Sequence, residues 1–142
     1  MATSRSGFTL LELLICASVM TTIGAIAVPR FSGLQHRLAV RGASSLLTRA
    51  LLDARHHAAR RGTRIAVRFD TTAATVTVSA PSDTLARHDL HTLFGVSLAV
   101  TRDSIAYLPS GLGYGASNAR FIVSRGTAAD TVTVSRIGRV RR

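Results

Sequence analysis

The chain has 142 residues, a length that fits one compact domain with a single small core. All 18 basic residues are arginine, and against 7 acidic residues they give a formal net charge of +11, which favours acidic partners such as nucleic acid, anionic lipid or a negatively charged protein surface. Cys16 is the only cysteine, so an intramolecular disulfide is excluded.

Residues 8–28 form an apolar run in which Glu12 is the only charged residue. As a helix rising about 1.5 Å per residue, this run is about 30 Å long, which is enough to cross a bilayer. Three interpretations fit it. The run is a secretory signal peptide cleaved at the small-x-small motif 25–27, a plain membrane anchor, or an assembly helix that stays on the mature chain after a leader is removed between Gly7 and Phe8.

Glu12 favours the third interpretation. A charged residue at the bilayer midplane costs about 2.5–3.5 kcal/mol on insertion scales, and acidic residues in membrane helices are mostly functional. Cleavage between Gly7 and Phe8 creates a cationic amino terminus one helical turn before Glu12. This cation can neutralise the carboxylate within one chain or between helices packed side by side. We therefore assign Glu12 a pairing role in assembly.

The run GFTLLELL at residues 7–14 resembles the type III signal of type IV pilins and of the pseudopilins of type II secretion. The resemblance implies cleavage by prepilin peptidase after Gly7, N-methylation of Phe8 and assembly guided by Glu12. It also implies a leader at 1–7, a transmembrane and assembly helix at 8–29, a single pass through the inner membrane, and a periplasmic domain that enters a pilus or pseudopilus or stands at its tip. By charge alone, the arginines that follow the span favour the opposite orientation.

After the membrane segment, apolar residues first recur at the spacing of a helix and then, from residue 64, at every second position. Apolar residues recur at mostly helical spacing over 30–62, with Gly62 as the stop, and this predicts the second half of one long helix. We expect an α+β fold in which the long N-terminal helix, membrane-embedded in its first half, packs on an antiparallel sheet formed by the β-rich domain 63–142. The alternating segments predicted as strands are 64–70, 76–78, 96–101, 104–108, 120–124 and 131–137.

Two further segments resemble the GspH/FimT group of minor pilins and pseudopilins. They are LLDARHHAARRG at 51–62, which is similar to the end of that group's first helix, and VTVSRIGRVR at 132–141, which is similar to its closing strand. The resemblance implies that the partners are prepilin peptidase and other major and minor pilins or pseudopilins. Residues 81–95 match nothing in that group.

No enzyme is indicated by the residue patterns. His88 and His91 could meet on a helix, but no further ligand completes a metal site, so we expect no metal. The glycine-rich segment 111–115 lacks the pattern of a phosphate-binding loop and predicts a turn. We expect no catalytic residues and no cofactor.

The C-terminal arginines are the candidate binding residues. Guanidinium groups pair bidentately with phosphate, and a solvated terminus can reach a nucleic-acid backbone. In the FimT branch, the resemblance implies capture of double-stranded DNA in natural transformation through a glycine-arginine-x-arginine ending, which residues 138–141 match. The alternative is a purely structural pseudopilin of type II protein secretion that binds no DNA. The residues assigned to DNA contact are Arg136, Gly138, Arg139, Arg141 and Arg142.

Overall fold

A computed structural model describes residues 7–114 and 118–142, except for the side chains of residues 28 and 29. Residues 1–6 of the expected leader and Gly115 of the expected glycine-rich turn lie outside the described residues. The chain divides into two compact units, one ending at Leu34 and the other spanning Gln35–Arg142. Helix α1 (Leu10–Arg61) is one helix of 52 residues that starts in the first unit and continues into the second.

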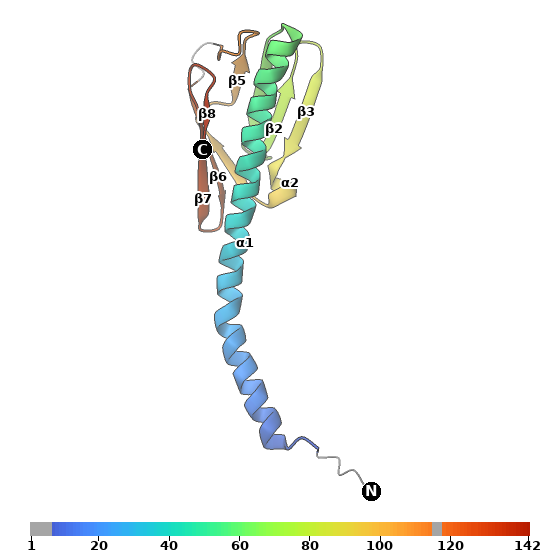
Figure 1. Cartoon of the computed structure of the whole chain (residues 1–142), viewed down its shortest axis with the longest axis vertical. Coiled ribbons are helices and arrows are strands. Elements are labelled where there is room, and N and C mark those ends of the chain that lie inside the picture. The colour runs from blue at the N-terminus through green and yellow to red at the C-terminus, as the bar shows by residue number, and fades with distance from the viewer. Residues whose placement is uncertain (1–6, 115–117) are drawn as a thin grey trace. The chain divides into compact units, whose positions relative to one another are not determined.

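The second unit contains two four-stranded antiparallel sheets and a short helix (Figure 1). The first sheet has the strand order β3-β2-β1-β5, and the second has the order β4-β6-β7-β8. Their bounds are β1 Ile65–Asp70, β2 Thr75–Ser79, β3 Thr84–Asp89, α2 Leu90–Phe94, β4 Ser97–Val100, β5 Ser104–Tyr107, β6 Ala119–Arg125, β7 Ala128–Val134 and β8 Val140–Arg141.

The part of α1 in this unit supplies the centre of the core. Its buried residues recur every three or four positions and are mostly alanine and leucine, so one helix face packs into the core. The two sheets also touch each other, because the rings of Phe69 in β1 and Phe121 in β6 lie 4.4 Å apart between centroids. The buried residues of α1 are Val40, Ala43, Ser44, Leu47, Ala50, Leu51, Ala54 and Ala58.

The α+β fold with a long N-terminal helix and antiparallel strands is confirmed, with differences in the number of sheets and strands. The expected single sheet is wrong, since the strands form two sheets. The strand expected at 131–137 is instead β7, which ends at Val134 and is followed by a turn and the two-residue β8. Strand β3 was not predicted, because its sequence, TLARHD, lacks the apolar alternation of a strand that covers a core.

Helix α2 was also missed, although its boundary residues carry recognisable signals. The side chain of Asp89 accepts a hydrogen bond from the backbone N–H of Thr92 at 2.8 Å, as an N-cap does. This bond is the main reason that the pKa of Asp89 lies below its usual value. Gly95 ends the helix with φ 62°, and its N–H donates to the carbonyl of His91. Both signals lie within residues 81–95, which resemblance left unassigned.

A close backbone contact joins the β7–β8 turn to the loop that follows β5. Gly138 has φ 75°, and a Cβ placed there would lie 2.7 Å from the carbonyl oxygen of Gly111 and 3.3 Å from the ring of Tyr107. Tyr107 is buried, and this burial raises its pKa to about 12, although the charge of Arg55 opposes the shift. Only glycine satisfies both the left-handed backbone and the contact with Gly111.

We predict that Gly138→Ala destabilises the second unit by about 2–3 kcal/mol, because it adds a clash to the strain of a positive φ. Gly62→Ala is the matched control: Gly62 has φ 63° but nothing within 4 Å of its Cβ position, so we expect a cost of about 1 kcal/mol. Thermal unfolding of both variants, followed by near-ultraviolet circular dichroism, measures the difference. Equal costs for the two variants would show that the contact with Gly111 contributes nothing.

Candidate functional site

The start of α1 is closed by a capping box that involves Glu12. The backbone N–H of Thr9 donates to Glu12 Oε2 at 3.3 Å, and the N–H of Glu12 donates to Thr9 Oγ1 at 3.3 Å. This reciprocal pair satisfies two N–H groups that the first helical turn leaves without partners. Thr9 was not among the predicted site residues, although the spacing T-x-x-E is a readable capping signal. Glu12 therefore has a structural role that does not depend on a partner helix.

The first unit leaves its apolar side chains uncovered. Of the helices that the structure describes, α1 alone is long and apolar enough to cross a membrane, judged by length and composition. Phe8 is exposed next to Gly7, where processing is expected. Such a surface needs lipid or other apolar helices around it. The exposed large apolar residues from Phe8 to Ile26 are Phe8, Leu10, Leu11, Leu13, Leu14, Ile15, Val19, Met20, Ile23 and Ile26.

The C-terminal arginines lie on a hydrogen-bonded hairpin rather than on a free tail. Strand β8 pairs antiparallel with β7, with Thr133 opposite Arg141 and Val134 opposite Val140. The turn between the strands is closed by a hydrogen bond from the N–H of Ser135 to the carbonyl of Arg139 at 2.9 Å. The positions of Arg139 and Arg141 are therefore fixed by the sheet.

The spacing arginine-x-arginine places Arg139 and Arg141 on one face of the hairpin, because side chains alternate along a strand. Val140, between them, is half-buried and packs against the core. Both arginines are exposed and line a hollow of about 320 Å³ together with Thr133, Val134, Ser135 and Ile137. Arg136 is exposed in the adjoining turn. This face carries cationic donors beside a small apolar surface.

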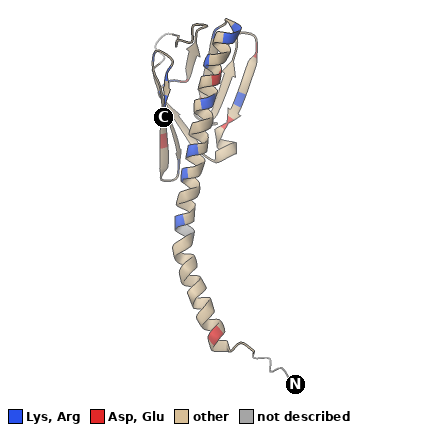
Figure 2. Ribbon diagram, in the orientation of Figure 1, with Lys and Arg blue, Asp and Glu red and all other residues tan. Residues whose placement is uncertain are grey.

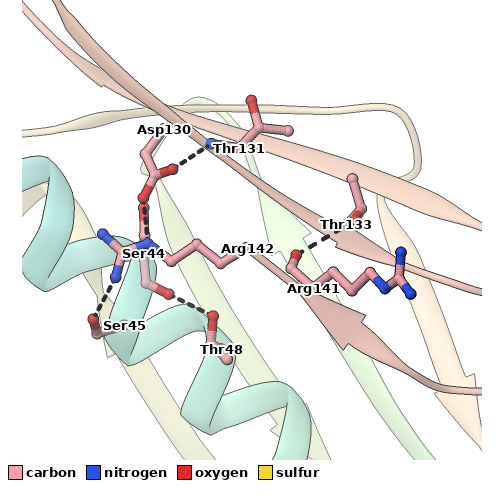
Figure 3. Close-up of polar contacts among 8 residues, drawn as sticks. All are labelled: Ser44, Ser45, Thr48, Asp130, Thr131, Thr133, Arg141 and Arg142. Atoms are coloured by element: carbon pink, nitrogen blue, oxygen red, sulfur yellow. Dashed lines mark hydrogen bonds and ion pairs between the residues drawn. The ribbon is translucent and has the colours of Figure 1, made fainter.

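Arg142 points the other way and is engaged within the protein (Figure 3). Its Nε donates to Asp130 Oδ2 at 2.5 Å, and its Nη1 donates to Ser45 Oγ of α1 at 3.1 Å. The side chain of Arg142 is 37% exposed to solvent. Figure 3 shows Arg141 directed away from this contact. The structure thus separates Arg142 from the pair formed by Arg139 and Arg141.

Asp130 is an acidic residue of this region that sequence analysis did not identify. Partial burial raises the pKa of its carboxyl, but the hydrogen bond from Arg142, with contributions from Ser44 and from the N–H of Thr131, outweighs burial and leaves the pKa below its usual value. Asp130 therefore stays ionised at neutral pH and holds Arg142 against α1. No local sequence pattern marks this contact.

Arginines are spread over both the helix and the strands of the second unit, and acidic residues are sparse (Figure 2). Within residues 7–114 and 118–142, no three His, Cys, Asp or Glu side chains gather as metal ligands would. His91 lies with its Nδ1 3.4 Å from the carbonyl oxygen of Val96, next to the C-terminal end of α2. The charged groups on the surface of the second unit are therefore mainly arginine guanidinium groups.

No protein-family model and no curated protein sequence matches the chain. Among solved structures, the type IV minor pilin FimU of Pseudomonas aeruginosa superposes with a TM-score of 0.64 at 14% sequence identity, over 74% of this chain and 88% of that chain. This chain has the minor pilin fold. The minor pseudopilin EpsH of the type 2 secretion system of Vibrio cholerae superposes with a TM-score of 0.58 at 16% identity, over 72% of this chain and 94% of that chain.

The minor pilin fold confirms the architecture that the resemblance implied. At 14–16% identity the comparisons show the fold alone, so function has to be argued from the residues that this chain places on it. These are Glu12 with its apolar helix surface, and the hairpin that carries Arg139 and Arg141. The minor pilin fold itself is compatible with both a pilus and a secretion system.

We predict that the contact between Asp130 and Arg142 stabilises the fold by about 1 kcal/mol or less at neutral pH, as partly exposed ion pairs do. Because the folded-state pKa of Asp130 is lowered, this contribution is present above the ordinary carboxyl pKa of about 4 and disappears as the pH falls through the folded value. Chemical denaturation of wild type and Asp130→Asn between about pH 7 and pH 3 tests this, with Asp53→Asn on exposed helix surface as control. A difference between wild type and Asp130→Asn that persists unchanged at the acidic end would contradict it.

Proposed function

We propose that the protein is a minor pilin or pseudopilin, anchored in the inner membrane by α1 and incorporated into, or placed at the tip of, a thin filament. The observation that carries this proposal is the minor pilin fold joined to an apolar helix start whose large side chains are exposed. A filament core of packed helices, like a bilayer, would cover those side chains. The second unit then lies on the periplasmic side, and other pilins or pseudopilins are the partners.

We infer that prepilin peptidase cleaves between Gly7 and Phe8 and that Phe8 is N-methylated. Support comes from the signal GFTLLELL and from the position of Glu12, one turn after the new terminus. A carboxylate on an otherwise apolar helix is expensive to bury unless a cation meets it. The new amino terminus of this chain or of a neighbouring subunit is that cation.

A type IV pilus and a type II secretion system are the two candidate assemblies for this protein, and they differ in the role that the C-terminal hairpin would have. In a type IV pilus active in transformation, Arg139 and Arg141 bind the backbone of double-stranded DNA, supported by their exposure on one fixed face. In type II protein secretion, the same residues contact neighbouring subunits or secreted protein, and no DNA binds. FimU and EpsH come from these two systems, and this chain has a fold similar to each of them. The exposed arginine pair favours the first.

We propose a structural or binding role rather than an enzymatic one. The candidate side chains are guanidinium groups, which remain protonated at physiological pH and so do not serve as general acids or bases.

The pairing role of Glu12 can be separated from its capping role. Glu12→Gln keeps the capping box, which accepts glutamine, but removes the charge. Thr9→Ala removes the cap and keeps the charge. We expect Glu12→Gln to reduce incorporation into sheared filaments about tenfold or more, since an uncompensated terminal cation is left buried, and Thr9→Ala to assemble nearly normally. Immunoblots of filament and membrane fractions measure both.

Mass spectrometry of the membrane fraction is the control for these variants. All of them should yield a mature chain that begins at Phe8 with one added methyl group. A mature chain that begins at Val28 would overturn the filament proposal in favour of a secreted protein. Loss of assembly in Thr9→Ala together with near-normal assembly in Glu12→Gln would show that Glu12 acts through the cap alone.

For DNA, we predict that the affinity of the full chain in detergent for a DNA duplex falls about tenfold between about 50 and 200 mM salt, as two phosphate contacts require. Changing both Arg139 and Arg141 to Gln should make the salt slope shallower by about 2. Arg142→Gln is the matched control, because Arg142 is held by Asp130 and Ser45, and it should leave the slope unchanged. If changing Arg139 and Arg141 leaves the affinity for DNA and its salt slope unchanged, the result would support the secretion pseudopilin instead.

A further inference from the structure

A second group of arginines lies on the outer face of the first sheet, away from the C-terminal hairpin. Arg68 on β1 is opposite Ser104 on β5, and Ala66 is opposite Ala106. These small neighbours leave a hollow of about 270 Å³ on the sheet surface. Arg64, Arg68, Arg102 and Tyr114 are among the residues that line it.

Tyr114 is an exposed aromatic ring held in place beside this hollow. Its backbone N–H donates to the carbonyl of Ala106 at 2.8 Å, which ties it to the edge of β5. The guanidinium of Arg64 lies 5.0 Å from the centroid of the Tyr114 ring. Tyr114 is nevertheless 55% exposed. A fixed, accessible ring with a cation stacked against it is a surface on which a planar base can stack.

The hollow is lined by basic residues and by no acidic residue. Within the part of the chain that the structure describes, Arg64, Arg68 and Arg102 form no ion pair, and the Nε of Arg102 donates to the carbonyl of Asn118 at 3.3 Å, which orients its guanidinium. Asp70 and Asp103 line an adjoining hollow with Arg68 and are not among the residues that line this one.

Single-stranded nucleic acid fits this combination better than a duplex does. Its unstacked bases offer a free face to an aromatic ring, whereas a duplex keeps its bases stacked inside. Phosphates flanking the base would meet the guanidinium groups at the rim. An acidic protein segment would use the arginines but gain nothing from the ring.

We propose that this hollow binds one nucleotide of single-stranded nucleic acid, with its base on Tyr114 and its phosphates on Arg64, Arg68 and Arg102. The proposal extends the nucleic-acid binding suggested for the hairpin and rests on that proposed function, but it uses different residues. The loop that contains Gly111 and Tyr114 also contacts the β7–β8 turn at Gly138, so a contact between two turns joins the elements that carry the two sites.

The test compares a labelled oligothymidine of about 15 nucleotides with its duplex by fluorescence anisotropy, using the full chain in detergent at about 50 mM salt. Tyr114→Leu should weaken binding of the single strand about tenfold and change duplex binding less than about twofold. Tyr114→Phe keeps the ring and should bind like wild type. Arg68→Gln should weaken single-strand binding more than Arg49→Gln, which changes an exposed arginine of α1.

Three outcomes would overturn the proposal. They are no single-strand binding by wild type, equal loss in Tyr114→Leu and Tyr114→Phe, and competition by polyglutamate that matches competition by unlabelled oligonucleotide. Failure of the hairpin site is distinguishable, because changing Arg139 and Arg141 to Gln would then leave duplex binding intact while the response of the single strand to Tyr114→Leu remains.

Discussion

Burial of one face of α1 between Gln35 and Arg61 is the interaction on which the second unit depends. Both sheets turn their apolar sides toward the shared core, and neither has another layer to cover it among the described residues. Alanine at positions 43, 50, 54 and 58 keeps the buried side chains on that helix face short. Leu47 and Leu51 fill the remaining space. A bulky residue at these alanines would push the sheets away from the helix and from each other, including at the contact between Phe69 and Phe121.

Strand geometry gives chemically identical arginines different roles. The alternation of side chains along β8 and into the next residue sends Arg141 outward and Arg142 toward α1, where Asp130 and Ser45 hold it. On β1 the same alternation places Arg68 outward between buried Val67 and Phe69. The net charge of the chain therefore says little about where an anion binds. Which guanidinium groups remain available is decided by register and by the few carboxylates that the fold brings near them.

The elements with a strong local signal could be predicted from sequence, and the contacts between distant segments could not. The long helix and strands β1, β2, β4, β5 and β6 followed from apolar periodicity, and the motif at 7–14 was readable as it stood. Strand β3 carries too few apolar residues for alternation to reveal it, and its place follows only from pairing with β2. The position of Arg142 depends on Ser45, 97 residues away, which no spacing rule connects. The requirement for glycine at 138 likewise arises from Gly111 across the fold.

The hairpin turn has a consequence for proteolysis. Arg136 and Ile137 are both exposed, and the bond between them is of the kind that trypsin-like proteases cut in accessible turns. All the buried apolar core residues lie at or before Val134. One cut would therefore separate Arg139, Arg141 and Arg142 covalently from the rest of the chain, and only the pairing of β8 with β7 and the contacts of Arg142 would hold them in place. A single proteolytic event would thus be enough to remove the cationic hairpin face once those contacts open.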